Sequence, residues 1–363
     1  MRNADSGRGQ IRATRDQVLA FRLAQHHLSQ RLSRGSQIEA AGACGIQNTP
    51  PGAAALALHA RVTGLTPADV DRALAIDKTL LQVWSVRAAP YVVPTSAAAV
   101  FTTGVLPEGE ESLRFFLSGA GPHLDLVGMS ASEVAERTAA ALPAILDGRE
   151  LTKDELGVAL ARRLAQDLTP QQLTLWNMPD GFRSNRYGET IVRFAISVVA
   201  LHGLLCIAPR RRNVTTFTRT DQWLGAPLPQ VNRAHAQAEL VRRYLHCYGP
   251  STAEHLAAWA GIAPAQAAQA WSLVERELVE VNVDGQMTWL QQCDLPRFTS
   301  PATPEGIRLL PPHDPYLLLR DRAMLIPDTA LQRHLWRPSG NPGVVLADGR
   351  CVATWRPRKR ESG

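Results

Sequence analysis

Residues 242–261 read RRYLHCYGPSTAEHLAAWAG, and this stretch decides the fold that the sequence predicts. Alanine, leucine and valine recur at helical spacing over residues 233–248, which predicts a helix. Gly249-Pro250 ends that helix, because proline cannot continue its hydrogen bonds. The four residues from Ser251 to Glu254 then match a capping box, in which Ser and Glu each bond the backbone N–H of the other. A second helix therefore starts here and closes at the end of the quoted stretch.

The same region continues into a third helix and a β-hairpin. Pro264 suits the first turn of a helix over residues 265–277. The segment VEVNVDGQMTWLQ at 279–291 alternates strand-forming residues around Asp284-Gly285, a strong two-residue hairpin turn. Three helices followed by a hairpin are the pattern of a winged helix.

Two earlier regions predict further copies of this unit. The first has an N-terminal cap at Thr66 and wing-like strands over 80–93. The second has a T-x-x-E capping box at Thr152, a long helix over 190–206 and a hairpin after it. Beyond 295 the stretches 307–326 and 343–358 resemble strands. We predict an α+β fold, mainly α, of tandem winged-helix domains with a small C-terminal β module. The predicted boundaries are 11–100, 126–225, 231–295 and 300–358.

Composition favours a soluble chain with an anionic partner. Hydrophobic residues make up 45% and charged residues 20%, which allows a packed core. The net charge of +6 comes mainly from arginine, whose planar guanidinium pairs well with phosphate. No apolar run is long enough to span a membrane, and the N-terminus lacks the apolar core of a signal peptide, so a cytoplasmic protein is expected. The alternative is a merely basic surface on a structural or interaction module.

The cysteines predict neither disulfides nor a metal site. They are scattered, odd in number and form no C-x-x-C pair, which fits a reducing compartment. The segment His313-Asp314 also lacks further ligands at metal spacing, and Asp314 before proline is expected to make a turn. No cofactor is predicted either. The five cysteines stand at positions 44, 206, 247, 293 and 351.

Three segments together resemble a known family. They are the stretch quoted first, LLPPHDPYLLLRDR at 309–322 and VVLADGRCVATWRPR at 344–358. In combination they resemble the winged-helix DNA glycosylases of the AlkZ/YcaQ type, over about residues 20–358. The resemblance implies tandem winged helices in a C-shaped body. It also implies hydrolytic excision of alkylated bases or cross-links from DNA. No lysine or terminal proline amine is placed to suggest a lyase, so a monofunctional enzyme is expected, acting as a monomer on double-stranded DNA.

The resemblance places the reacting residues at Gln47-Asn48-Thr49. The family's signature is Gln-x-Gln or Gln-x-Asp, so Gln47 matches and Thr49 replaces the second polar residue. The Gln47 carboxamide would hold the attacking water, with the Thr49 hydroxyl on its other side. The family's Arg-Gly-Thr-x-His segment stands here as residues 87–91, where only Arg87 is retained. These departures leave an alternative, a DNA-binding member that does not hydrolyse, in which Gln47 and Asn48 satisfy backbone groups of a turn.

Basic residues supply the predicted DNA contacts. The three arginines from 210 to 212 lie at the predicted second hairpin turn, where they would pair with phosphates or enter a minor groove, or be solvated. The two arginines of Arg-Asp-Arg at 320–322 would support the DNA groove or form an internal salt bridge. The third-copy helix over 265–277 is nearly devoid of basic residues, so packing is expected of it. The predicted DNA-binding residues are Asn48, Arg87, Arg210, Arg211, Arg212, Arg320, Arg322, Arg356 and Arg358.

Overall fold

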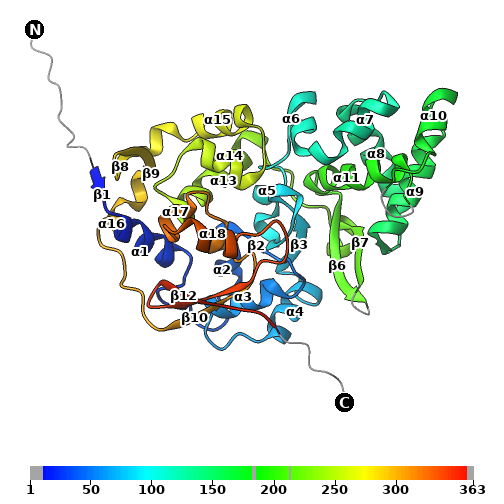
Figure 1. Cartoon of the computed structure of the whole chain (residues 1–363). Coiled ribbons are helices and arrows are strands. Elements are labelled where there is room, and N and C mark those ends of the chain that lie inside the picture. The colour runs from blue at the N-terminus through cyan, green and yellow to red at the C-terminus, as the bar shows by residue number, and fades with distance from the viewer. Residues whose placement is uncertain (1–10, 182–184, 212–213, 358–363) are drawn as a thin grey trace, which may run out of the picture.

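The computed structural model describes residues 11–181, 185–211 and 214–357. Within them, helices alternate with four small three-stranded sheets, which confirms the α+β prediction. In Figure 1 the green helices and hairpin of the middle of the chain stand to one side of the molecule. The blue N-terminal, yellow and red C-terminal segments form the other part.

The first unit, residues 37–94, places a short strand between its first two helices. This strand, β2, pairs with the last strand of the unit, so the sheet order is β2-β4-β3. The Thr66 side chain caps α4 in a capping box with Asp69, as predicted. The elements are α2 (Gln37–Cys44), β2 (Ile46–Gln47), α3 (Ala53–Arg61), α4 (Pro67–Ala75), β3 (Leu80–Trp84) and β4 (Pro90–Pro94).

The second unit, residues 131–219, repeats this order with an added helix. Its sheet order, β5-β7-β6, matches that of the first unit, and Thr152 forms the predicted capping box with Glu155. The elements are α8 (Ala131–Ile145), β5 (Leu151–Thr152), α9 (Lys153–Ala165), α10 (Pro170–Trp176), α11 (Tyr187–Leu201), β6 (Leu205–Arg211) and β7 (Val214–Arg219). The predicted helix over 190–206 is wrong at its end, because Leu205 and Cys206 already belong to β6. Short helices lead into and out of this unit, namely α5 (Ala98–Phe101), α6 (Gly109–Phe116), α7 (Gly121–Val127) and α12 (Thr220–Leu224).

The third unit, residues 233–291, contains the stretch quoted first. Its elements are α13 (Arg233–Tyr248), α14 (Ala253–Ala260), α15 (Pro264–Ser272), β8 (Leu278–Val283) and β9 (Gln286–Gln291). The predicted capping box at Ser251 is wrong, because Thr252 caps α14 by accepting from the His255 N–H. Ser251 instead exchanges backbone hydrogen bonds with Trp289 of β9, where the other two units have their short strand. Its hydroxyl lies 2.7 Å from that of Tyr244.

The chain ends pack onto the third and first units. Strand β1 (Ile11–Ala13) pairs in parallel with β8, and α1 (Arg15–Gln25) follows it. The C-terminal sheet comprises β10 (Ile307–Leu310), β11 (Gly343–Ala347) and β12 (Arg350–Trp355), with α16 (Leu295–Thr299), α17 (Arg322–Leu325) and α18 (Thr329–Leu335) beside it. The strand predicted over 307–326 is wrong beyond Leu310, because three prolines that lack the ladder donor follow within five residues.

One hydrophobic core cluster runs through all parts of the chain. It includes Leu81 of the first unit, Leu160 of the second, Trp259 of the third and Leu346 of the C-terminal sheet. The units therefore share a core, which favours fixed relative positions. In the described part of the chain, no helix combines the length and the apolar character that crossing a membrane requires.

Candidate functional site

A cavity of about 430 Å³ opens between the first unit and the C-terminal module. Gln47 and Arg87 line it from the first unit, and Arg320 and Arg322 line it from the chain after β10. Four residues predicted from distant parts of the sequence thus meet at one place. The other lining residues are Ala89, His313, Leu317, Leu318, Leu319, Leu335, Trp336, Arg337, Pro338, Asn341 and Pro342.

The Gln47 side chain is held in one orientation at the cavity wall. It lies at the end of β2, and only 6% of the residue is exposed. Its Oε1 atom accepts a hydrogen bond of 3.0 Å from Nη2 of Arg87 and a longer one of 3.4 Å from the Tyr91 hydroxyl. Burial raises the pKa of Tyr91, so its hydroxyl stays protonated and remains a donor. Two donors therefore point at the oxygen that the sequence predicts to hold water.

Arg87 connects this carboxamide to the third unit. It sits in the left-handed region at φ 56°, in the turn between β3 and β4. Its Nη1 donates to the carbonyl oxygen of Trp259. Gly261, also left-handed at φ 70°, lies so close that an added Cβ would be 2.8 Å from Cγ of Arg87. The stretch that decides the fold thus supports the turn that holds Gln47.

The charged residues in the rest of the cavity wall are arginines. Burial, together with the neighbouring charges of Arg87 and Arg322, lowers the pKa of Arg320 to about 10. Its Nε atom is buried without a hydrogen-bond partner among the described residues. The Arg322 guanidinium lies over the Trp336 ring at 5.1 Å. None of the described residues that line the cavity is acidic, so an anion would relieve this repulsion.

Asn48 faces a different space from its neighbour Gln47. Its Oδ1 accepts from the backbone N–H groups of Gly52 (2.9 Å) and Ala54 (3.2 Å), and its Nδ2 donates to Gln82. This is the turn-satisfying role that remained as an alternative, now seen for Asn48 but not for Gln47. Asn48 also lines a second cavity, of about 670 Å³, between the first and second units. Thr49 is half-buried and is not among the residues that line either cavity.

The remaining predicted DNA contacts lie apart from the first cavity. Arg210 is exposed on β6, within 3.3 Å of the Thr215 hydroxyl, and lines the second cavity. Arg356 is exposed and donates to the carbonyl oxygen of Gly340. Arg212 and Arg358 lie outside the described residues, and the same holds for the side chain of Arg211.

Several site residues were not predicted from the sequence. Tyr91 stands where the family's segment has a histidine, and it supplies a hydrogen-bond donor there. His313 has its pKa lowered by burial and by Arg87, and it lines the cavity together with Trp336. The signal that could have found His313 was its place in the LLPPHDPY segment. Nothing local marked Trp259, because only its backbone oxygen takes part.

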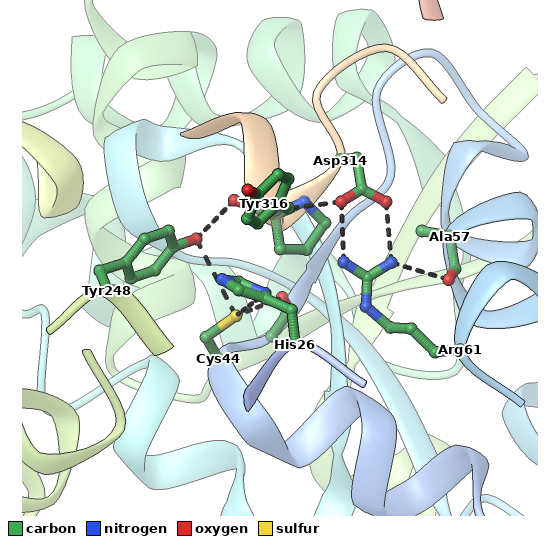
Figure 2. A network of polar contacts seen from close by, with 9 residues as sticks. His26, Cys44, Ala57, Arg61, Tyr248, Asp314 and Tyr316 are labelled. Atoms are coloured by element: carbon green, nitrogen blue, oxygen red, sulfur yellow. Dashed lines mark hydrogen bonds and ion pairs between the residues drawn. The ribbon is translucent and has the colours of Figure 1, made fainter. Parts of the chain in front are cut away.

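A fully buried ion pair anchors the C-terminal module beside the cavity. Arg61 of α3 donates two hydrogen bonds to Asp314, of 2.8 and 2.7 Å, and their side chains are 1% and 0% exposed. Asp314 also accepts from the N–H of Tyr316 and so makes the predicted turn as well. Figure 2 shows this pair beside His26, Cys44 and Tyr248. The ion pair fixes where His313, the preceding residue, meets the cavity.

Comparisons with known proteins find likenesses along most of the chain. A sequence model of the family described as DNA glycosylase AlkZ-like matches residues 40–363. An interstrand DNA cross-link repair glycosylase of Streptomyces sahachiroi is 26% identical over 356 residues, which cover 95% of this chain and 88% of that protein. The solved structure of the Streptomyces sahachiroi DNA glycosylase AlkZ superposes with a TM-score of 0.76 at 25% identity. That match covers 97% of this chain and 90% of the other.

Proposed function

The chain belongs to the AlkZ-like DNA glycosylase family, and from this premise we propose that it hydrolyses the N-glycosidic bond of alkylated bases in double-stranded DNA. The observation that carries the proposal is the Gln47 carboxamide, held by Arg87 and Tyr91 at the wall of a cationic cavity. Repair of DNA is the role that the family implies.

The fold proposed for this function is a tandem of winged helices. The order of helix, short strand, further helices and hairpin recurs in the units at 37–94 and 131–219, and the unit at 233–291 has an isolated bridge at Ser251 in place of the short strand. This recurrence supports winged-helix domains over 11–100, 126–225 and 231–295, followed by a β module over 300–358. Winged helices commonly bind DNA through a helix and a wing. Here the turn of the first hairpin holds Arg87 beside the cavity.

The chemistry asks little of the leaving group. An alkylated, cationic base departs as a neutral molecule, so the enzyme mainly has to place a water and tolerate positive charge at the sugar. A carboxamide oxygen accepts a hydrogen bond from such a water without deprotonating it. Arg87 fixes the Gln47 oxygen for this task, and the Thr49 hydroxyl is proposed as a second contact of the water. Water is the nucleophile, so the protein acts as a monofunctional glycosylase.

The arginines are proposed to hold the DNA backbone. Arg320 and Arg322 bring positive charge to a wall with no acidic neighbours, and phosphate oxygens are suited to pair with guanidinium groups. Their place beside Gln47 would seat the phosphates that flank the damaged nucleotide. Contacts farther along the duplex are proposed for Asn48, Arg210, Arg211, Arg212, Arg356 and Arg358.

One observation favours a second candidate, a member of the family that binds DNA without hydrolysis. The Gln47 oxygen already accepts from two donors, and a carbonyl oxygen has two lone pairs. Water can therefore enter only if one donor withdraws. The 3.4 Å bond from Tyr91 is long for an O–H donor, so it is the weaker of the two. We give hydrolysis precedence for this reason.

The deciding experiment is single-turnover base release from a duplex that carries one N7-methylguanine. We expect release by the parent protein and a loss of about 100-fold or more for Gln47→Ala, because the water loses its acceptor. Binding of the same duplex should change only a few-fold. Tight binding without release by the parent would establish the second candidate. Equal release by both proteins would remove Gln47 from the mechanism.

A further inference from the structure

A second cluster of reactive side chains lies behind the cavity wall. His26 follows α1, Cys44 is the last residue of α2, and Cys247 lies in α13. Their ligand atoms all lie within 4.8 Å of one another, and the three residues are 1%, 2% and 0% exposed. Figure 2 shows His26 and Cys44 side by side below Tyr248. No step of the proposed reaction uses them.

The side-chain atoms of this cluster make few and long hydrogen bonds. Nδ1 of His26 lies 3.9 Å from the Cys44 sulfur, and its Nε2 is buried without a hydrogen-bond partner among the described residues. The imidazole is packed edge-on against Tyr248 and Tyr316, with ring centroids 5.0 and 5.5 Å apart. The nitrogen that faces Cys44 is Nδ1, and its contact with the sulfur is long, so Nδ1 is the ring atom that could bind a ligand shared with Cys44.

The geometry suits a thiophilic ion. Zinc bonds thiolate sulfur at about 2.3 Å and imidazole nitrogen at about 2.0–2.1 Å, so tetrahedral ligand atoms lie roughly 3.5–3.8 Å apart. The distance of 3.9 Å between Nδ1 of His26 and Sγ of Cys44 is close to that value. Two thiolates also cancel the charge of Zn²⁺, which leaves a neutral site in a buried place.

We propose that His26, Cys44 and Cys247 form a zinc-binding site that ties α1, α2 and α13 together. Each thiol gives up its proton to solvent when it coordinates, so binding of one Zn²⁺ by both cysteines releases two protons. The Tyr248 hydroxyl lies 3.9 Å from the Cys44 sulfur.

Zinc bound at this site would affect the position of Gln47 through the short stretch of backbone that joins α2 to β2. Cys44 ends α2, and the strand that carries Gln47 begins two residues later. An ion that fixes Cys44 against α13 therefore fixes the start of β2. The binding of zinc stands independently of the proposed function. Only its effect on base release rests on that function.

The test uses the full-length protein, stripped of metal under reducing conditions and then titrated with Zn²⁺ or Co²⁺. We expect one ion per chain, a rise in the melting temperature and the charge-transfer absorption of cobalt bound to thiolate. Cys44→Ser and Cys247→Ser should weaken binding by about 100-fold or more. Cys206→Ser, at an equally buried cysteine in the second unit, and Cys293→Ser, at an exposed one, should leave it unchanged.

Three results would overturn the proposal. These are no stoichiometric binding by the parent, binding that survives both cluster substitutions, and a cobalt spectrum without thiolate bands. A Cys44–Cys247 disulfide in the reduced preparation, seen as a mass loss of two hydrogen atoms, would also overturn it. If the serine variants fail to fold, the cobalt spectrum of the parent still decides. Parent protein that binds zinc but releases no base would leave the site intact and refute the glycosylase function alone.

Discussion

The first and third units share one order of elements but carry different parts of the site. In the first, the short strand after the first helix presents Gln47 to the cavity. In the third, the matching residue is Ser251, which is buried and forms a β-bridge with Trp289. The two hairpin turns differ likewise, because Arg87 points to the cavity while Asp284-Gly285 is exposed. One unit supplies side chains, and the other supplies a backbone oxygen and a close-packed glycine.

The difference teaches that repetition of a unit does not repeat its function. The third unit contributes through the carbonyl of Trp259 and the contact of Gly261 with Arg87. Arg242 and Glu277 of this unit form a half-exposed ion pair at 2.7 Å. Four substitutions test this division, each with a matched control elsewhere in the chain.

The largest effect is expected for Asp314→Asn, which breaks the ion pair that joins the first unit to the C-terminal module. Arg61 would keep a buried charge without a counter-charge, which typically costs about 3–5 kcal/mol of folding free energy. Glu277→Gln breaks a half-exposed pair of the third unit and should cost about 1 kcal/mol or less. Denaturant unfolding followed by tryptophan fluorescence measures both. Equal losses would show that the buried pair has no special role.

Gly261→Ala tests whether the third unit supports the site. The new methyl group would meet Arg87 at 2.8 Å and strain a left-handed backbone. We expect base release to fall about 10- to 100-fold through displacement of Arg87. Gly285→Ala is the matched control, since it is also left-handed but has open space around it, and it should keep the rate. A normal rate of base release by Gly261→Ala would show that the third unit does not support the position of Arg87.

Arg320→Met removes a guanidinium that has no acidic neighbour in the cavity wall. We expect the affinity for duplex DNA to fall about tenfold, and the slope of log affinity against log salt to flatten by about one. Arg242→Met, in the third unit, removes an arginine that is already paired and should change neither quantity. Titrations at several salt concentrations measure both. An unchanged slope for Arg320→Met would exclude a phosphate contact there.

The smallest effect concerns the helix caps and depends on pH. Thr66→Ala should cost about 1 kcal/mol at neutral pH. Hydrogen bonds from the side chain and backbone of Thr66 lower the pKa of Asp69, so the stabilisation they give is complete above its ordinary value and fades as the pH falls. The loss caused by the substitution should therefore shrink in acid. Asn232→Ala, at the cap of α13, removes a group that does not titrate, so its cost should stay constant.

Local signals explain why so much of the architecture was predictable. Thr66, Thr152 and the Asp284-Gly285 turn act through neighbours within a few residues, and each forms the element that it predicts. The Ser251 box failed because a tertiary contact, the bridge to Trp289, occupies that backbone and moves the cap by one residue. The prediction for the C-terminal stretch failed because apolar residues were given more weight than the prolines among them.

The sequence by itself determined most of the order of helices and hairpins and the family, because these depend on local caps, turns and motifs, and it predicted the roles of Gln47 and Arg87. Only the tertiary structure decided what surrounds them. In the folded chain Arg320 and Gln47 line one cavity, and the Tyr91 hydroxyl donates to the side-chain oxygen of Gln47. Asn48 lines another cavity, and His26, Cys44 and Cys247 lie close together. The physical reason is that these contacts join residues far apart in the chain, which no local pattern encodes. The stretch at 242–261 shows both effects: its caps and turns determine local helices, and its packing against Arg87 supports the site.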